Sequence, residues 1–378
     1  MTGRKIISIN VNFLKNPIFW IMLGAVLIRL ILLIDMPYTY DEYSSLIRQG
    51  MPTFESMIEN GIRTDGHPAG LYSFLRVYVS IFGTTPWVLK LPFVLMSIGS
   101  VWLTFLIGKT WFSNRAGWLG AAMLGLLAFP VMNGLIARQY TPGLLFCLLS
   151  TWCWTKLVFE PSPKAWKWAL LLGLSFTGAA YFHYFAALFC VILWLAGWMF
   201  VKATHRKYYL VSAGIGILLF LPHVSITMDH LAIGGIPDVL PVPGWDFIVH
   251  HFGFISNFSW FIGVPLIFLA LAAVLRRFWL SKRSVLALVL FLAPIAIGFI
   301  YSNLQSPLLQ DRVLLFSFPF FGIWLGSVWK GVDQERFLRY VVGGFILVAL
   351  FVGFDRESHR YGLMTKGAFE DVLERSLA

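Results

Sequence analysis

Apolar runs long enough to cross a bilayer recur along the whole chain, and they restrict the folds that are open to it. A helix needs about 20 residues to cross a hydrocarbon core that is about 30 Å thick. Hydrophobic residues make up 58% of the chain and charged residues 12%, whereas soluble domains carry roughly twice that charged fraction. A membrane β-barrel would show short segments of alternating hydrophobicity instead. The sequence therefore predicts an all-α protein that crosses a membrane many times.

Short clusters of lysine and arginine separate the apolar runs, and such clusters mark the cytoplasmic side of a membrane protein. Placing them on one side gives about 11 transmembrane helices, the first of which leaves the cytoplasm. The predicted spans cover residues 18–34, 86–107, 117–134, 142–158, 168–181, 185–201, 209–221, 254–274, 285–301, 313–329 and 340–354. We expect one transmembrane domain over 1–354, followed by a short polar tail over 355–378.

Two long polar segments connect spans on the outer side. The first outer loop, 35–85, includes a short apolar stretch at 67–83 that carries Arg76 and several aromatic residues. If this stretch crossed the membrane, the later basic clusters would fall on the wrong side. We therefore expect helices that lie in the outer interface, with aromatic side chains at headgroup level. The second outer loop, 223–253, is rich in proline, glycine and histidine.

The distribution of charge points to a site on the outer side. The net charge of +11 does not indicate a nucleic-acid partner, because the basic residues follow the positive-inside pattern. Acids and histidines gather on the outer side, and of the eight histidines only His205 falls at an inner end. The positive-inside rule concerns lysine and arginine, and it gives no reason for acids and histidines to gather on the outer side. Titratable groups that gather on one face suggest a reaction or binding site there.

The first outer loop holds two candidate groups of catalytic residues. Asp41 and Glu42 follow the first span, and their side chains diverge, so that one acid can face a site while the other takes a second role. A carboxylate there can accept a proton or bind a divalent cation, or the pair can simply stabilise the start of a helix. Asp65 and His67 lie in a turn that Gly66 and Pro68 fix, where His67 can act as a base, a metal ligand or a phosphate contact. The alternative is a helix-capping aspartate with an interfacial histidine.

Three further candidates lie at outer ends of spans. Arg138 and Arg312 are lone arginines beside long apolar runs, and arginine binds phosphate bidentately without losing its charge. The alternatives are contact with lipid headgroups and, for Arg312, an ion pair with Asp311. His183 and Tyr184 follow the outer end of the fifth span, where a histidine is more often a packed, hydrogen-bonded residue than a ligand.

The order of these motifs resembles the GT-C glycosyltransferases, in the bacterial branch related to protein O-mannosyltransferases and to aminoarabinose transferases (glycosyltransferase family 39-like). An Asp-Glu pair opens the outer loop, as in that family. Five segments resemble later family motifs, namely DGHPAGLY, GTTPWVLKLPFVLMSIGS, IARQYTP, AYFHYFAALF and DRVLLFSFPFF. The chain departs from the pattern at Ala69 and Gly70, which replace a second proline and its neighbour, and at Lys90, where arginine is usual.

The resemblance implies a multi-span transferase that takes a hexosyl or pentosyl group from a polyprenyl-phosphate donor. It implies that Asp41 acts as general base or positions the acceptor, with Glu42 in support. The implied substrate-binding residues are Asp65, His67, Tyr72, Arg138, Tyr140, His183, Tyr184 and Arg312. The acceptor would be a lipid, a glycan or a protein at the outer, periplasmic face of a bacterial inner membrane. Whether the site binds a divalent cation stays open, and Glu42 and His67 are the candidate ligands.

Two other classes of protein remain open from the sequence. One is a transporter or flippase of a lipid-linked or anionic substrate, which would place charged residues near the middle of the membrane. The other is a membrane scaffold without catalytic residues. If the protein is an enzyme, we expect one substrate to reach the side chains of Asp41, Glu42, Asp65, His67 and Arg138.

Overall fold

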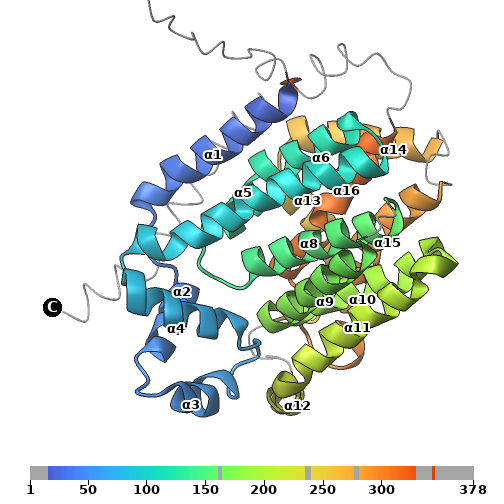
Figure 1. The fold of residues 1–378 in the computed structure, drawn as a ribbon. Coiled ribbons are helices and arrows are strands. Elements are labelled where there is room, and N and C mark those ends of the chain that lie inside the picture. The colour runs from blue at the N-terminus through green and yellow to red at the C-terminus, as the bar shows by residue number, and fades with distance from the viewer. Residues whose placement is uncertain (1–15, 161–163, 235–239, 276–280, 329–342, 345–378) are drawn as a thin grey trace, which may run out of the picture.

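The computed structural model describes residues 16–160, 164–234, 240–275, 281–328 and 343–344, and these residues contain helices and no strand. Figure 1 shows the helices packed as a bundle. Their bounds are α1 Pro17–Asp35, α2 Tyr40–Gln49, α3 Phe54–Met57, η2 Ile58–Ile62, α4 Gly70–Phe82, α5 Pro86–Trp111, α6 Asn114–Leu126, α7 Ala128–Gly134, α8 Tyr140–Val158, α9 Ala165–Phe182, α10 Tyr184–Gly197, α11 Arg206–Phe220, α12 Val224–Ile233, α13 Asp246–Ile255, α14 Trp260–Leu275, α15 Lys282–Leu304, η7 Asp311–Phe316 and α16 Phe318–Ser327.

The prediction of an all-α membrane protein is confirmed. Among the described residues, four helices are long and apolar enough to cross a membrane, and up to six when two bent pairs are each counted as one span. The bent pairs are α6 with α7, at 61°, and α13 with α14, at 110°. The number of 11 spans stays a prediction, because the span at 340–354, apart from residues 343–344, and the tail at 355–378 lie outside the described residues.

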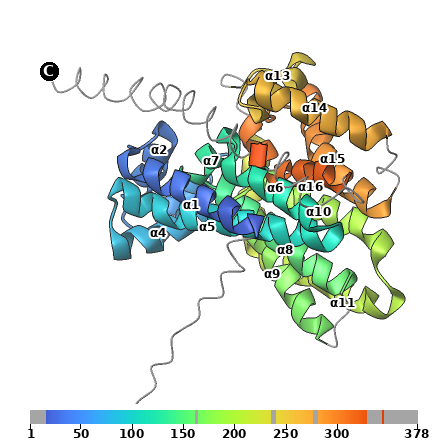
Figure 2. The same cartoon turned by 90° about the horizontal axis from the view of Figure 1, so that it is seen from above.

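The first outer loop folds as expected, into short helices. The helix α4 has 13 residues, so its length of about 20 Å is too short to cross the membrane. The second outer loop is more ordered than its composition suggests, since it contains α12 and begins α13. The helices α2, α3, α4 and α12 gather at one end of the bundle, which we call the loop end (Figure 1). Seen from above, α2 and α4 lie on one flank, and α13 and α14 lie on another (Figure 2).

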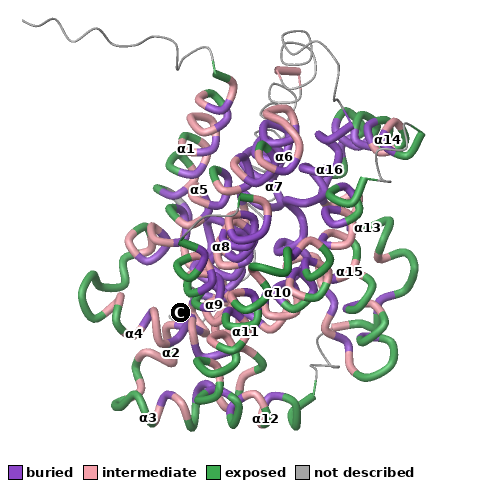
Figure 3. Tube along the Cα trace, turned by 45° about the vertical axis from the view of Figure 1, so that its right-hand side comes forward, coloured by how far each residue is buried: buried purple, intermediate pink, exposed green. Residues whose placement is uncertain are grey.

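The core of the bundle is built on α6, α8 and α16. Every residue of α6 from Ala116 to Leu126 is buried, and so is every residue of α16. Small residues let these two helices approach closely, since a Cβ atom at Gly322 would lie 2.9 Å from the Cα atom of Gly120. Figure 3 shows this buried centre and, by contrast, the exposed turns at the loop end. The core therefore holds the ends of the helices in fixed positions.

A buried arginine stabilises the bend between α6 and α7. Pro130 cannot donate to the carbonyl of Leu126, four residues earlier, and its ring crowds that carbonyl, which explains why α6 ends there. Nearby carbonyls of a helix end need other donors. Arg29 is fully buried, and its guanidinium donates to the carbonyls of Gly125 at 2.7 Å and Leu124 at 3.3 Å. Arg29, which lies within the first predicted span, therefore has a structural role.

We expect Arg29→Lys to lower the free energy of unfolding by about 1–3 kcal/mol, because a lysine cannot reproduce the fork of donors and leaves a buried carbonyl unsatisfied. Denaturant unfolding in detergent micelles measures the change. Arg63→Lys is the matched control, since Arg63 lies at the surface of the first outer loop, with its side chain 27% exposed. Equal stability of the two variants would remove Arg29 from this role.

Candidate active site

The start of α2 presents the two neighbouring acids in different surroundings. Thr39 caps the helix, because its hydroxyl accepts a hydrogen bond from the backbone of Glu42 while a carboxylate oxygen of Glu42 accepts from the backbone N–H of Thr39 at 2.8 Å. This reciprocal arrangement is a capping box. Successive helical residues point in directions about 100° apart, so Glu42 turns inward and Asp41 stays at the surface of the site.

Glu42 is fully buried and joins three parts of the chain. The Nζ atom of Lys90 lies 2.7 and 2.6 Å from its two carboxylate oxygens, and Lys90 is fully buried as well. The backbone N–H of Ala137 donates to the same carboxylate at 2.7 Å. The contacts of Glu42 tie α2 to α5 and to the turn before α8, and they support a positioning role for this residue.

Asp41 meets an arginine from the far end of the sequence. Its Oδ2 atom accepts from Nη1 of Arg312 at 2.6 Å, and the two side chains are 35% and 32% exposed. Arg138 approaches from the other side and donates to the backbone carbonyl of Asp41 at 3.1 Å and to the hydroxyl of Ser45 at 2.6 Å. An acid and two arginines therefore converge at the loop end, and the acid remains within reach of a ligand.

Arg312 does not pair with Asp311, the neighbour that the sequence offered as an alternative partner. Asp311 bonds instead to Nδ1 of His251 at 2.6 Å. This contact fastens α13, in the second outer loop, to η7. The sequence carries no local signal for this contact, and only the fold brings these two residues, 60 positions apart, together.

Asp65 is the centre of a second cluster next to α2. Its two carboxylate oxygens contact Nδ1 of His67 and the hydroxyl of Tyr72, each at 2.7 Å. Arg48, on the last turn of α2, lies 2.7 Å from the same carboxylate. Burial alone would raise the pKa of Asp65, but the hydrogen bonds from His67 and Tyr72 and the charge of Arg48 outweigh it and hold the pKa below its usual range. Sequence reasoning found Asp65, His67 and Tyr72, and it missed Arg48.

This cluster predicts a dependence of stability on pH. Because the pKa of Asp65 is lower in the folded chain, its carboxylate stabilises the fold above the unfolded pKa of about 3.9, and the stabilisation is lost as the pH falls through the folded value. We expect wild type to melt at a higher temperature than Asp65→Asn at neutral pH, and the gap to narrow below about pH 4. Asp229→Asn, at a half-exposed acid, is the control. A gap that does not change with pH would contradict the assignment.

His183 lies between the two clusters. It is 6% exposed, and its ring centre is 5.9 Å from that of His67 and 5.5 Å from that of Tyr140. Its Nδ1 atom accepts from the backbone of Phe185 and caps α10. The Cζ atom of Arg312 lies 6.0 Å from the ring centre of Tyr140. His183 is thus a packed residue, as the simpler interpretation held, and it lies among the candidate residues.

Tyr184 belongs to a different set of contacts, which fastens α12 onto the first outer loop. Its hydroxyl lies 2.7 Å from Nδ1 of His230, and Nε2 of His230 lies 2.7 Å from the carbonyl oxygen of Ile62. His223 accepts from the backbone of Ala69 at 3.0 Å. These contacts hold the loop in place, and none of them involves Asp41.

The two candidate metal ligands do not come together. Across the described parts of the chain, no group of three or more His, Cys, Asp or Glu side chains is placed to hold a metal ion. Glu42 contacts Lys90, while Nδ1 of His67 contacts Asp65.

Comparison with known proteins supports the motif-based resemblance. Residues 66–226 match the family model of dolichyl-phosphate-mannose-protein mannosyltransferases. No curated protein matches the chain by sequence. The predicted segments DGHPAGLY, IARQYTP and AYFHYFAALF fall wholly or almost wholly within the matched region.

Solved structures share the fold. ArnT from Cupriavidus metallidurans in the apo state is similar with a TM-score of 0.55 and 13% identity, over 86% of this chain and 62% of that one. The same ArnT bound to undecaprenyl phosphate gives 0.55 and 10%, over 90% and 64%. The Archaeoglobus fulgidus oligosaccharyltransferase, in complex with Zn and sulfate, gives 0.54 and 11%, over 88% and 51%. The chain thus spans less than two thirds of the length of these proteins.

The expectation from the sequence motifs is therefore confirmed at the level of the fold: this is a membrane protein that shares the GT-C fold of ArnT and of the archaeal oligosaccharyltransferase.

Proposed function

We propose that this protein is a membrane glycosyltransferase that moves a sugar from a polyprenyl-phosphate donor to an acceptor. The observation that carries the proposal is the convergence of Asp41, Arg312 and Arg138 at the loop end, from three distant parts of the sequence. The fold supports it, since the similar ArnT has been solved with undecaprenyl phosphate bound. Nothing in a passive scaffold would require a partly exposed acid whose carboxylate pairs with one arginine and whose backbone carbonyl accepts from a second.

The proposed reaction assigns a role to each of these three residues. The acceptor hydroxyl attacks the anomeric carbon of the sugar as its proton passes to the Asp41 carboxylate. The bond between the anomeric carbon and the phosphate oxygen breaks, and its electron pair leaves with the polyprenyl phosphate. Arg312 and Arg138 stabilise the negative charge of the departing phosphate. One acceptor–sugar bond forms and one sugar–phosphate bond breaks, so the sugar is the only group transferred.

The ion pair between Asp41 and Arg312 suggests how donor binding prepares the base. A donor phosphate competes with the Asp41 carboxylate for Nη1 of Arg312, and it offers the arginine a bidentate partner. Once Arg312 turns to the phosphate, Oδ2 of Asp41 is available to the acceptor. This order would keep the base paired until the donor is bound.

The remaining candidates support this centre. Asp65 fixes the ring of His67 through Nδ1 and leaves Nε2 for a substrate group. Tyr72 donates to Asp65, the ring of His183 lies beside that of His67, and the guanidinium of Arg312 lies near the ring of Tyr140. Glu42 and Tyr184 position helices and are not assigned a substrate contact. The acceptor is a lipid, a glycan or a protein, and the basic clusters support placement of the site on the periplasmic or extracellular face of the inner membrane.

A transporter or flippase is the alternative function. Alternating access usually places charged groups near mid-membrane, where they line a substrate path. Arg29, a buried charge within α1, instead donates to the carbonyls of a helix bend. That contact favours the enzyme over the transporter.

The proposal is tested by transfer of radiolabelled sugar from a panel of polyprenyl-phosphate donors by the purified chain in liposomes. We expect transfer by wild type and, for Arg312→Gln, a loss of about 10- to 1,000-fold in kcat/KM, because the phosphate loses a charged donor. Arg63→Gln is the matched control, since Arg63 pairs with Asp229 at the surface and should transfer normally. No transfer by wild type, together with movement of the lipid donor across the liposome membrane, would favour the transporter.

A further inference from the structure

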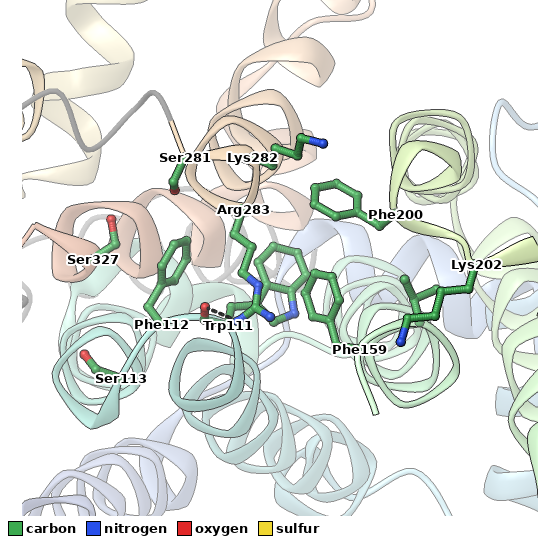
Figure 4. A pocket seen from close by; sticks show the side chains of 11 residues that line it. Trp111, Phe112, Ser113, Phe159, Phe200, Lys202, Ser281, Lys282, Arg283 and Ser327 are labelled. Carbon is green, nitrogen blue, oxygen red and sulfur yellow. Dashed lines mark hydrogen bonds between the residues drawn. The ribbon is translucent and has the colours of Figure 1, made fainter. Parts of the chain in front are cut away.

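A pocket of about 690 Å³ lies in the bundle, away from the Asp41 site. It is formed by the ends of five different segments of the chain (Figure 4). Its lining residues are Trp111, Phe112, Ser113, Val158, Phe159, Phe200, Lys202, Ser281, Lys282, Arg283 and Ser327.

The pocket lies at the opposite end of the helices from the candidate active site. Lys90 contacts Glu42 near the start of α5, and Trp111 is the last residue of α5. The two residues are 21 positions apart, a rise of about 30 Å along a helix. That rise equals the thickness of a hydrocarbon core. The pocket is therefore at the level of the other membrane surface.

The pocket carries three positive charges, and among the described residues no acid lines it. Lys202 follows α10, while Lys282 and Arg283 begin α15. Arg283 is held against the pocket wall, because it donates to the carbonyl of Trp111 at 3.0 Å and its Cζ atom lies 4.4 Å from the ring centre of Phe159. Figure 4 shows Arg283 beside the rings of Trp111 and Phe159. The positive-inside rule explains why these cations lie on the cytoplasmic side. It does not explain why all three line the same pocket.

The position of Lys282 and Arg283 on their helix adds a second argument for an anion. They occupy the first turn of α15, which contains no acid. The N-terminus of a helix carries a partial positive charge, so cations there are unfavourable by themselves. A bound anion would interact favourably with both the side chains and the helix end.

We propose that this pocket binds the phosphate of an anionic membrane phospholipid. The cations supply the phosphate contacts, and the hydroxyls of Ser113 and Ser281 can donate to phosphate oxygens. The rings of Trp111, Phe112, Phe159 and Phe200 form an apolar wall beside the cations. Basic pockets between helices at the cytoplasmic surface are typical lipid-headgroup sites. A lipid is favoured over a soluble anion for two reasons. Apolar rings lie beside the cations, and the pocket lies at the depth of the lipid headgroups.

The test compares two variants that lose the same charge from the same end of the bundle. The pocket variant is Lys202→Gln/Lys282→Gln/Arg283→Gln. The control is Lys167→Gln/Arg206→Gln/Lys207→Gln, at residues that begin α9 and α11 and do not line the pocket. Retention of phosphatidylglycerol and of phosphatidylcholine by the full chain is measured by native mass spectrometry from mixed micelles. If the triple variant fails to fold, Lys202→Gln/Lys282→Gln keeps the Arg283 contacts and is used instead.

We expect wild type and the control each to retain one molecule of phosphatidylglycerol. The pocket variant should bind this lipid about tenfold more weakly, or weaker still, since each cation near a lipid surface contributes about a fivefold factor to the binding constant. Phosphatidylcholine should be retained no better by wild type than by the pocket variant. Equal retention of phosphatidylglycerol by the two variants would overturn the proposal. Displacement of the lipid by millimolar inorganic phosphate would overturn it in favour of a soluble anion.

Discussion

Asp41→Asn is expected to reduce sugar transfer by about 100- to 10,000-fold, the range typical of a lost general base. This corresponds to about 3–5 kcal/mol of activation free energy. The amide keeps the size of the side chain, but it can neither accept the proton of the acceptor nor hold Arg312 by charge. Single-turnover transfer with saturating donor measures the effect on the chemical step.

The control for this variant is Asp229→Asn, which makes the same chemical change at an acid that pairs with Arg63. Both proteins should accumulate to wild-type levels, because Asp41 is partly exposed and its ion pair contributes little to stability. Asp41→Glu separates charge from position, since it keeps the carboxylate but moves it by about one methylene; we expect a loss of about 100-fold.

A further comparison tests whether Asp41 and Arg312 act together. If the donor phosphate displaces Asp41 from Arg312, the effects of Asp41→Asn and Arg312→Gln in one chain should be smaller than the product of the single effects. Transfer by Asp41→Asn within about threefold of wild type would remove Asp41 from the proposed mechanism. Asp65 would then be the acid to test, since Glu42 is enclosed by protein contacts.

The sequence predicts the type of fold well because membrane crossing is a local property. An apolar run of sufficient length predicts a helix wherever it occurs, so α1, α5, α8, α9 and α15 lie close to the predicted spans. The sequence predicts bends less well. Pro130 is a local signal for the end of α6, but the donor that stabilises the bend, Arg29, is about 100 residues away and only the packing brings it there.

The candidate site shows the same limit. The divergence of neighbouring side chains predicts different surroundings for the two acids, and the fold leaves Asp41 partly exposed and buries Glu42. Pairings between distant residues carry no such local signal. Arg312 therefore had Asp311 as its nearest candidate partner, whereas the fold pairs it with Asp41, 271 positions away. Lys90 stood out as a departure from a motif, and its contact with Glu42 shows that this position needs a cation.

The buried pair of Glu42 and Lys90 gives the largest expected effect on stability. Lys90→Met leaves the Glu42 carboxylate buried without its counter-ion, and breaking a buried ion pair in this way costs about 3–5 kcal/mol. Typical domains have only about 5–15 kcal/mol of stability, so the variant should accumulate poorly and unfold at a much lower temperature. Thermal unfolding in detergent, followed by circular dichroism, measures the loss.

The double variant Glu42→Gln/Lys90→Met separates structure from chemistry. It removes both charges, while the amide oxygen of glutamine can still accept from Thr39 or Ala137, as the carboxylate does now. We expect it to regain most of the stability lost in Lys90→Met, because neutral replacement of a buried pair is far less costly than leaving one charge alone.

The same double variant decides what Glu42 does. If Glu42 only positions α2, and through it Asp41, a chain that regains its stability should also regain transfer, to within about tenfold of wild type. If Glu42 contacts the reacting groups, the double variant should be as stable as expected and still inactive. Stability that returns without activity would therefore contradict the positioning role and return Glu42 to the catalytic residues that the motif implied.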